Sequence, residues 1–397
     1  MLPTPKECSE CGGDPVNHPL EYAMRLVDIA ATPFFHSALY AGGGWLNIGI
    51  KKKKYIDWYK LFERFGLGEF LDKPDNKTLL LCQVLWEEAA ARGIVMREFR
   101  PLGLPTNSFV YTDTDGSFSF ESIPFPPGTK PPVWWVDTKS VMKKKFNRLG
   151  IPVARGSAVF TLQGAKKIYN TLEKPVIVKP FEGTASRHTT IHIQNEEELV
   201  RAFKAAKQVS PLVIIEEELT GSVYRPTLVS GKLVATIRRD PPRVIGDGAH
   251  TVAQLIDIAN THPKRQGPYY SHIKIAPLLH AELARQNMAL ESIPALGQIV
   301  NLHPKINWSV GGTTTDVTDE VHPENKLLFE EIARVIKAPI VGIDFIAADI
   351  SRSWKEQTKC GVIECNGRPY FDNHHLPFEG SPRNVAGVLW AQVAPLS

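Results

Sequence analysis

The sequence predicts an α+β protein with mixed sheets, in which a distinct N-terminal region precedes a larger C-terminal part. Residues up to about Pro132 are rich in aromatic side chains and turns, and the proline-rich stretch 125–132 can continue neither a helix nor a central strand. After this linker, short apolar strands alternate with amphipathic helices, without the regular βαβ repetition of a doubly wound sheet. A chain of 397 residues is long enough for two or three domains.

The side-chain pattern indicates the elements in order. Before the linker, 76–92 is predicted to be a helix with Val84 and Leu85 on its apolar face. After the linker, a helix begins at Asn195, a favourable N-cap residue that Glu198 follows three positions later. Strands are predicted at 175–178, 212–215, 232–237, 339–346 and 361–364, a helix at 327–337, a hairpin turn at 230–231, and an insertion at about 262–305.

The composition is that of a globular protein in a reducing compartment. The chain is 43% hydrophobic and 22% charged, and a net charge of +4 gives no reason by itself to expect nucleic-acid binding. No apolar stretch is long enough to cross a membrane, and the first residues lack the apolar core of a signal peptide. The five cysteines are sparse and odd in number. We therefore expect a cytoplasmic protein with neither a nucleic-acid nor a membrane partner.

Two local clusters in the first 60 residues could bind an ion or could have a purely structural role. The basic run Lys51–Lys54 fits either a solvated face or an anion site, and we favour the solvated face. Cys8 and Cys11 form a CxxC pair near His18, but no second pair completes a zinc site. We therefore do not expect structural metal there.

Polar side chains follow two apolar runs in the last part of the sequence. Asp344 ends one run, whereas Glu364 and Asn366 follow the other and lie two apart on a strand, so that their side chains leave the same face. Burying such groups is unfavourable unless a partner binds them, and magnesium prefers hard oxygen ligands together with nucleotide phosphates. The three residues form either a magnesium site or two strand ends whose acids cap loops, and alone they do not decide between the two.

Basic residues at strand positions form a second candidate set. Lys179 ends an apolar strand, where it either reaches nucleotide phosphates as a point charge or lies at the surface. The segment 181–190 that follows is rich in small hydroxyl residues and would cover the phosphates. Arg225 and Arg239 flank the predicted hairpin on facing strands, where they either hold oxyanions together or are ordinary surface arginines.

Two loops complete the candidate site. Glu216–Leu219 joins a buried strand to the hairpin and either offers backbone groups and acids to a purine and its ribose or forms a solvated acidic turn. Asn307–Thr315 is rich in glycine, threonine and serine, so its backbone could approach a phosphoryl or acyl group closely. A flexible hairpin loop is the alternative for this second segment, but we favour function because its density of hydroxyl and glycine residues is unusual.

In this order, the elements resemble the ATP-grasp ligase family. The resemblance runs from about Val136 to Asn384 and is most specific at 311–325, with close matches at 243–252 and 342–344. It is closest to the ATP-grasp half of cyanophycin synthetase, and more distant to glutathione synthetase and D-alanine ligase. The Mur-ligase-like half of cyanophycin synthetase, which adds arginine, is expected to be absent.

The resemblance implies an ATP-grasp fold, in which a lid subdomain at 133–215 and a catalytic subdomain at 216–397, both α+β, clasp ATP. Residues 1–132 would form a separate N-terminal α/β domain, matched by position alone, for which substrate binding is one role. The cofactors would be ATP and two magnesium ions, and the partners a small carboxylate and an amine, with a homo-oligomer expected. By position, Lys139, Lys179, Glu216, Glu217, Glu218 and Leu219 would bind ATP; Arg225, Arg239, Asn307, Ser309, Gly311 and Gly312 would contact the γ-phosphate or acyl phosphate; and Asp344, Glu364 and Asn366 would bind magnesium.

The chain also departs from the family pattern. Ser186 and His188 stand where the lid loop has glycines, and Val223 replaces an acid expected to touch the ribose. Gly367–Asp372 replaces a small residue, Pro-Gly and a basic residue at an edge that faces substrate in the family, so aspartate specificity is not expected. We predict an ATP-dependent carboxylate–amine ligase that forms an amide through an acyl phosphate, from amino acids or a short peptide. The alternative is a nucleotide- or peptide-binding homologue that has lost turnover.

Overall fold

The structure is a computed structural model that describes residues 6–7, 15–24, 26, 53–114, 116–126, 129, 134–136, 139–181, 187–304, 306 and 310–395. Several residues singled out in the sequence lie outside these ranges: Cys8, Cys11, Lys51, Lys52, Ser186, Asn307 and Ser309. Within these ranges, no helix is both long enough and apolar enough to cross a membrane.

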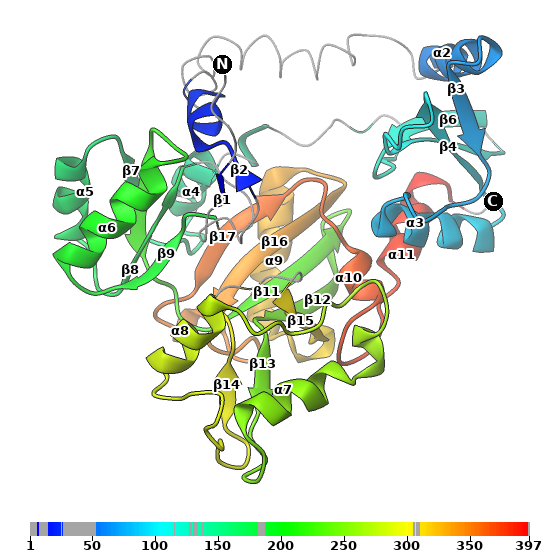
Figure 1. The fold of residues 1–397 in the computed structure, drawn as a ribbon. Coiled ribbons are helices and arrows are strands. Elements are labelled where there is room, and N and C mark those ends of the chain that lie inside the picture. Colours follow the sequence, from blue (N-terminus) through cyan, green and yellow to red (C-terminus); the bar gives the residue numbers. More distant parts are fainter. Residues whose placement is uncertain are drawn as a thin grey trace.

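A five-stranded antiparallel sheet forms the centre of the molecule (Figure 1). Helix α9 (Pro323–Ile336) packs on it, and Phe345 of the sheet contacts Phe329 of this helix in a buried core. The predicted hairpin turn is confirmed, since Ser230 and Gly231 adopt positive φ angles of 48° and 79°. The strand order is β15 (Thr313–Asp316), β12 (Lys232–Asp240), β11 (Ser222–Val229), β16 (Ile340–Ala347) and β17 (Gly361–Asn366).

A second, four-stranded antiparallel sheet has a core of its own with helices α5 (Leu162–Tyr169) and α6 (Glu196–Lys207). Asn195 is confirmed as the N-cap of α6, because its side chain accepts a hydrogen bond from the Glu198 N–H at 2.9 Å. The strand order is β7 (Gly156–Val159), β10 (Val213–Glu217), β8 (Val176–Pro180) and β9 (Thr190–Ile193).

The segment before this second sheet packs with the central sheet instead. The 3-10 turn η3 (Trp134–Val136) and helix α4 (Lys139–Arg148) bury Met142 and Phe146 in the same core as α9. The predicted lid 133–215 therefore includes residues from two cores, and the division of the chain into subdomains remains a prediction.

A small unit with its own core projects from the central sheet. Strand β13 (Arg243–Ile245) pairs with β14 (Ile299–Asn301), and α7 (Val252–Asn260) and α8 (Pro277–Arg285) pack beside them. The predicted insertion at about 262–305 therefore covers only the second part of a compact unit whose core already includes Val244.

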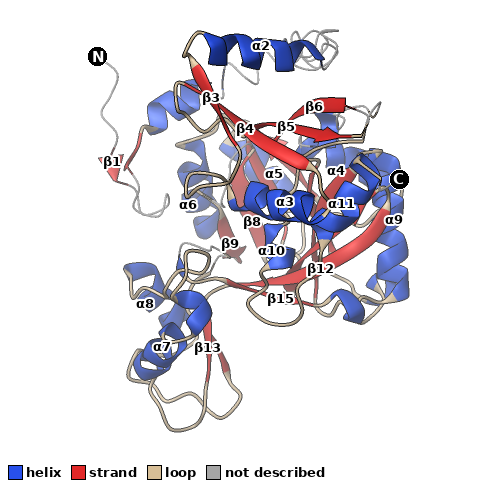
Figure 2. Ribbon diagram, turned by 90° about the vertical axis from the view of Figure 1, so that its right-hand side faces the viewer, coloured by secondary structure: helices blue, strands red, loops and turns tan. Residues whose placement is uncertain are grey.

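The N-terminal region forms a four-stranded antiparallel sheet that shares a core with a C-terminal helix. Figures 1 and 2 show α3 (Leu80–Ala91), which confirms the predicted helix at 76–92, beside α11 (Val385–Val393). Trp390 of α11 donates its Nε1–H to the carbonyl of Leu85 at 2.9 Å. The strand order of this sheet is β3 (Gly68–Leu71), β4 (Val95–Pro101), β5 (Ser108–Asp113) and β6 (Gly116–Glu121). Helix α2 (Lys53–Arg64) precedes the sheet in the sequence. Before it, β1 (Lys6–Glu7) pairs with β2 (Pro15–Val16).

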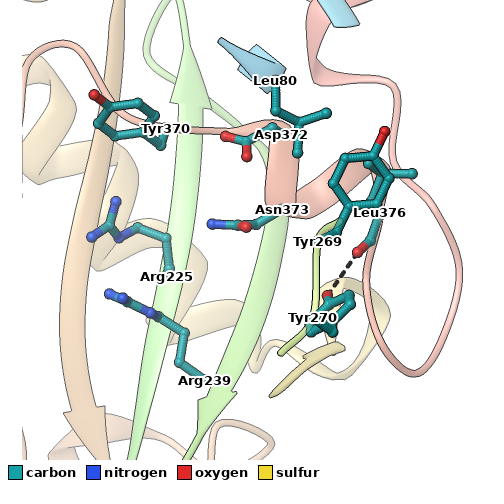
Figure 3. A pocket seen from close by; sticks show the side chains of 9 residues that line it. All are labelled: Leu80, Arg225, Arg239, Tyr269, Tyr270, Tyr370, Asp372, Asn373 and Leu376. Carbon is teal, nitrogen blue, oxygen red and sulfur yellow. Dashed lines mark hydrogen bonds between the residues drawn. The ribbon is translucent and has the colours of Figure 1, made fainter. Parts of the chain in front are cut away.

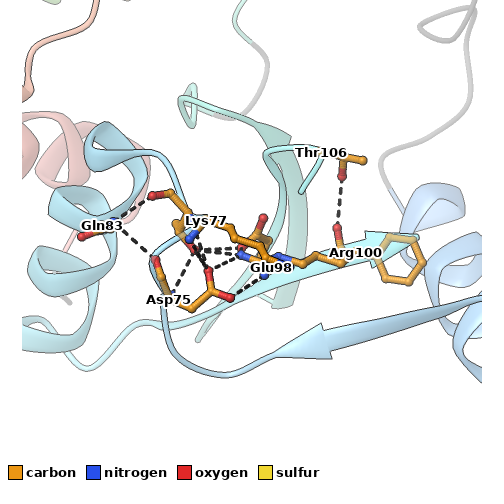
Figure 4. A network of polar contacts seen from close by, with 8 residues as sticks. Asp75, Lys77, Gln83, Glu98, Arg100 and Thr106 are labelled. Atoms are coloured by element: carbon orange, nitrogen blue, oxygen red, sulfur yellow. Dashed lines mark hydrogen bonds and ion pairs between the residues drawn. The ribbon is translucent and has the colours of Figure 1, made fainter. Parts of the chain in front are cut away.

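A buried polar network fixes the loop that leads into α3 (Figure 4). Arg100 donates two hydrogen bonds to the carboxylate of Asp75, at 2.6 and 2.7 Å, and one to Glu98 at 2.8 Å. Thr78 also donates to Glu98, at 3.1 Å. Because Glu98 and Arg100 are 0% and 3% exposed, these charge-assisted bonds hold the start of α3 against β4.

The remaining short elements connect these units: the 3-10 turns η4 (Pro263–Arg265), η6 (Thr318–Glu320) and η7 (Trp354–Glu356), and helix α10 (Asp372–His375).

Candidate functional site

A row of charged side chains lies across one face of the central sheet. The register of β11 against β16 places Arg225 opposite Asp344, and β17 pairs Glu364 with Asp344. Arg239 lies on β12, two residues beyond Ile237, which is the cross-strand partner of Arg225. Since alternate residues of a strand share a face, both arginines and both carboxylates belong to the same side of the sheet.

Ion pairs connect this row. The Nε and Nη2 atoms of Arg225 both donate to the carboxylate of Asp344, the second at 2.8 Å, and Nη1 of Arg239 lies 3.5 Å from Asp344 Oδ2. Burial acts to raise the pKa of Asp344, but the charges of Arg225 and Arg239 outweigh it and lower this pKa. The buried carboxylate is therefore ionised, and it holds two guanidinium groups side by side.

Gly342 provides the space in which Arg225 lies. A Cβ atom at this position would be 2.7 Å from Pro369 Cβ and 3.3 Å from Arg225 Cδ. Any side chain there would therefore push on the segment after β17 and on the arginine.

The three residues predicted to bind magnesium lie on the neighbouring strands β16 and β17, but Asp344 lies within β16 and not, as expected, at its end. Asp344 and Glu364 are a cross-strand pair, and Asn366 is paired with Gly342. The buried Nδ2 of Asn366 has no hydrogen-bond partner among the described residues. The set offers oxygen donors of the kind that magnesium prefers, with the Asp344 carboxylate held ionised, and it therefore fits the ion. No three His, Cys, Asp or Glu side chains in the described part of the chain cluster as a metal site, so further ligands would come from substrate oxygens.

A second cluster of opposite charges lies on the four-stranded sheet. The carboxylate of Glu216, 3% exposed, accepts hydrogen bonds from the ammonium groups of Lys143 and Lys179. Burial acts to raise the pKa of Glu216, whereas the charges of Lys179 and Lys143 lower it overall. Burial and the neighbouring Lys179 charge in turn lower the pKa of Lys143 to about 8. The site thus has a net positive charge next to a buried anion.

Lys143 is a site residue that the sequence reasoning did not identify. It follows Lys139 by four residues on α4, so both side chains leave the same face of the helix. Lys139 Nζ lies 3.5 Å from Glu364 Oε2 of the central sheet, whereas Lys143 contacts Glu216. The i, i+4 spacing of two lysines was the signal that could have found it.

The predicted hinge Glu216–Leu219 does not present its acids to one side. Glu217 lies beside Glu216 on β10 and accepts hydrogen bonds from Arg155 at 3.0 and 3.1 Å. Glu218 accepts the His192 N–H at 2.8 Å, and Leu219 is half-buried. Because side chains alternate along a strand, a ligand on the Glu216 side would meet only the backbone of Glu217.

A cavity of about 340 Å³ adjoins the arginine end of the charged row (Figure 3). Its walls come from three parts of the chain: Arg225 and Arg239 of the central sheet, Tyr269 and Tyr270 of the projecting unit, and Leu80 of α3. The remaining wall is 370–376, with the first turn of α10. The cavity is therefore closed partly by the N-terminal region.

The glycines predicted to meet the acyl phosphate lie at the start of β15. Gly311 and Gly312 are both buried. Gly311 has a φ of 100°, and its carbonyl accepts a hydrogen bond from Arg265 at 3.0 Å. The hydroxyl groups of Thr314 and Tyr270 lie 2.8 Å apart, which places this strand next to the cavity wall. The roles of Asn307 and Ser309 remain a prediction, since they lie outside the described ranges.

One of the lid residues that depart from the family pattern has an informative backbone angle. His188, which stands where a glycine was expected, has a φ of 52°, in the left-handed region that glycine adopts most easily. Its ring is buried, and Nδ1 lies 2.9 Å from the Ala205 carbonyl. The backbone thus keeps a glycine-like conformation despite the side chain.

Comparison with known proteins agrees with this arrangement. The chain is 36% identical over 261 residues to cyanophycin synthetase from Nostoc sp. (strain PCC 7120), a match that covers 65% of this chain and 29% of that protein. It is 27% identical over 376 residues to the glutathione biosynthesis bifunctional protein GshAB of Mannheimia succiniciproducens, covering 90% of this chain and 48% of the relative. The crystal structure of a bifunctional glutathione synthetase from Pasteurella multocida superposes with a TM-score of 0.60 at 26% identity, over 90% of this chain and 48% of that one.

The chain has the ATP-grasp fold. It is a relative of cyanophycin synthetase and of GshAB, and the predicted resemblance is confirmed. No family model matches the chain. The chain spans less than half the length of these relatives, so the ATP-grasp assignment describes its fold and not the activity of the whole relatives.

Proposed function

We propose that this ATP-grasp protein is an ATP-dependent carboxylate–amine ligase, which forms an amide through an acyl phosphate. The observation that carries the proposal is the row of ion-paired groups on one face of the central sheet, from Arg239 to Glu364, beside a cavity that could hold a small substrate. The likeness to cyanophycin synthetase and GshAB supports amino acids or a short peptide as the substrates.

The chain's own residues would bind and orient the reactants. Lys139 and Lys179 would hold ATP phosphates, and the backbone at Glu216–Leu219 would hold the adenine. Arg225 and Arg239, fixed by Asp344, would bind the oxygens of the phosphoryl group that moves from ATP to the substrate carboxylate. Gly311 and Gly312, together with Asn307 and Ser309, would contact the acyl-phosphate end of the substrate.

Asp344, Glu364 and Asn366 would hold magnesium. When bound, magnesium neutralises negative charge on the β- and γ-phosphates. We propose that the site binds two such ions. An amine then attacks the acyl carbon, the C–N bond forms, and phosphate leaves with the electron pair of the C–O bond and takes up the proton that the nitrogen loses. No side-chain nucleophile is needed, because the protein contributes position and charge. We also propose that the enzyme is cytoplasmic and forms a homo-oligomer.

A second candidate is a homologue that binds nucleotide or peptide without turnover. Val223, which faces Arg239 across β11 and β12 in place of an acid, motivates it. The test is release of ADP from MgATP with pooled amino acids and short peptides. A ligase releases ADP above the substrate-free rate with at least one pool; ATP binding without any such increase would reject the ligase in favour of the binder.

A further inference from the structure

The cavity beside the arginines has an acidic group on its opposite wall. Asp372 is the first residue of α10, and Figure 3 shows it with Asn373 across the cavity from Arg225 and Arg239. Its Oδ1 atom is buried and has no hydrogen-bond partner among the described residues. Burial also raises the pKa of Asp372, because an ionised carboxylate without a partner is unfavourable there, so a cation beside the carboxylate would stabilise its ionised form.

The cavity lining around Asp372 does not supply that group. Leu80 and Leu376 are apolar, and the hydroxyl of Tyr270 donates to the Leu376 carbonyl at 2.7 Å. The guanidinium of Arg225 is bound at two atoms by Asp344. Among the described residues, no side chain is hydrogen-bonded to the carboxylate of Asp372, which lines the cavity.

The charges on the two opposite walls of the cavity indicate which kind of molecule it binds. Arg225 and Arg239 suit a carboxylate or its phosphorylated form, whereas Asp372 suits a cation. We propose that Asp372 binds the protonated amino or guanidinium group of a dipolar substrate, an amino acid or the first residue of a short peptide, whose carboxylate lies toward the two arginines. This inference rests on the proposed ligase function and names a residue that selects its substrate.

The N-terminal region contributes to substrate selection, because one of its residues lines the same cavity. Leu80 lies at the start of α3, and the network of Arg100, Glu98 and Thr78 fixes the loop before it. The cavity is therefore incomplete without α3, whose Leu80 side chain lies beside Asp372 (Figure 3).

The test measures binding separately from turnover. Titration calorimetry of the full chain would use glycinamide, L-alaninamide and L-argininamide, which carry a cation and no carboxylate, and N-acetylglycine and N-acetyl-L-alanine, which carry only the anion. At least one amide should bind the wild type, and Asp372→Asn should weaken that binding by about 10- to 100-fold, the effect of losing one charge-assisted hydrogen bond. Asp372→Glu should retain part of the affinity, and binding of the N-acetyl compounds should not change.

Glu379→Gln is the matched control, because Glu379 is an exposed carboxylate on the same segment and does not line the cavity. Thermal unfolding of each variant checks the fold, and if Asp372→Asn does not fold, Asp372→Glu and Asp372→Ser replace it. The inference is overturned if no amide binds the wild type, or if an amide binds wild type and Asp372→Asn equally, as a protonated Asp372 would require.

ADP release distinguishes this inference from the function on which it rests. With an amino-acid substrate, Asp372→Asn should raise KM by about 10-fold or more and change kcat much less. Amide binding that depends on Asp372, without ADP release from any pool, would reject the ligase and retain the cation site. ADP release with an unchanged KM in Asp372→Asn would retain the ligase and reject the cation site.

Discussion

Lys139 and Lys143 lie one turn apart on the same face of α4, yet each contacts a carboxylate on a different sheet. Lys139 contacts Glu364 of the central sheet, and Lys143 contacts Glu216 of the four-stranded sheet. The first turns of α4 therefore join the two charged clusters, and because α4 itself is buried in the core of the central sheet, the position of Glu216 is tied to that sheet.

The lowered pKa of Lys143 predicts a pH-dependent contribution to stability. This pKa falls from 10.5 to about 8, chiefly because burial disfavours the charged form. Between these values the unfolded chain binds a proton that the folded chain does not, so stability should rise with pH across this window. Lys143→Met should lack that rise, so that wild type gains about 1–3 kcal/mol over the variant between pH 7.5 and 10 in urea unfolding.

Lys144→Met provides the control for this comparison, since Lys144 is exposed on the same helix. Its stability should follow the pH dependence of the wild type. If the stability of wild type and of Lys143→Met changed with pH in parallel, the lowered pKa of Lys143 would be contradicted.

Glu364→Gln should abolish magnesium-dependent ADP release and leave the fold intact. The glutamate side chain is 38% exposed, and its contact with Lys139 at 3.5 Å is a partly solvated ion pair, so the free energy of unfolding should change by less than about 1 kcal/mol. ADP release should fall by about 100-fold or more, since a charged metal ligand is lost. Glu356→Gln, at an exposed acid outside the site, should have normal activity; activity retained in Glu364→Gln would remove this residue from the metal set.

Gly342→Ala should impair the site through packing alone. The added methyl group would lie 2.7 Å from Pro369 Cβ and 3.3 Å from Arg225 Cδ, so the arginine and the segment after β17 must move. We expect kcat to fall by about 10-fold or more, with about 1–3 kcal/mol lost from the free energy of unfolding. Gly267→Ala is the control, because the nearest atom to its Cβ would be 4.0 Å away. Equal activity of the two variants would show that Arg225 does not depend on this space.

Trp390→Ala should destabilise the N-terminal sheet and the C-terminal part together. The indole is fully buried between α3 and the sheet, and its loss should lower the free energy of unfolding by about 3–5 kcal/mol. Because the core is shared, circular dichroism and tryptophan fluorescence should report one transition at the same urea concentration. Trp58→Ala removes an indole that is 52% exposed and should have little effect. An N-terminal transition that is unchanged in Trp390→Ala would show that the two parts unfold independently.

The sequence was most informative where the relevant signal is local. Asn195 and the 230–231 turn are specified by neighbouring residues, and the structure confirms both. The pairing of Asp344 with Glu364 brings together two residues of the predicted metal set, although Asp344 lies within β16 and not at the end of a strand. Lys143 has only its i, i+4 spacing from Lys139 as a local signal, and Asp372 only its place in the segment Gly367–Asp372, which departs from the family pattern. Leu80 depends on contacts between distant segments, and nothing in its local sequence distinguishes it. The same holds for α4, which precedes the second sheet in sequence but belongs to the core of the central sheet.

The shared core of α3 and α11 has a consequence for synthesis on the ribosome. The strands that carry Tyr111 and Phe120 emerge early, whereas Trp390, whose ring contacts both of theirs, is translated only after the second sheet and the central sheet. During that interval the nascent N-terminal sheet exposes an aromatic surface that its own residues do not cover, and such a surface is a binding site for chaperones and a start point for aggregation. The N-terminal region should therefore complete its folding only once α11 has emerged and docked on it.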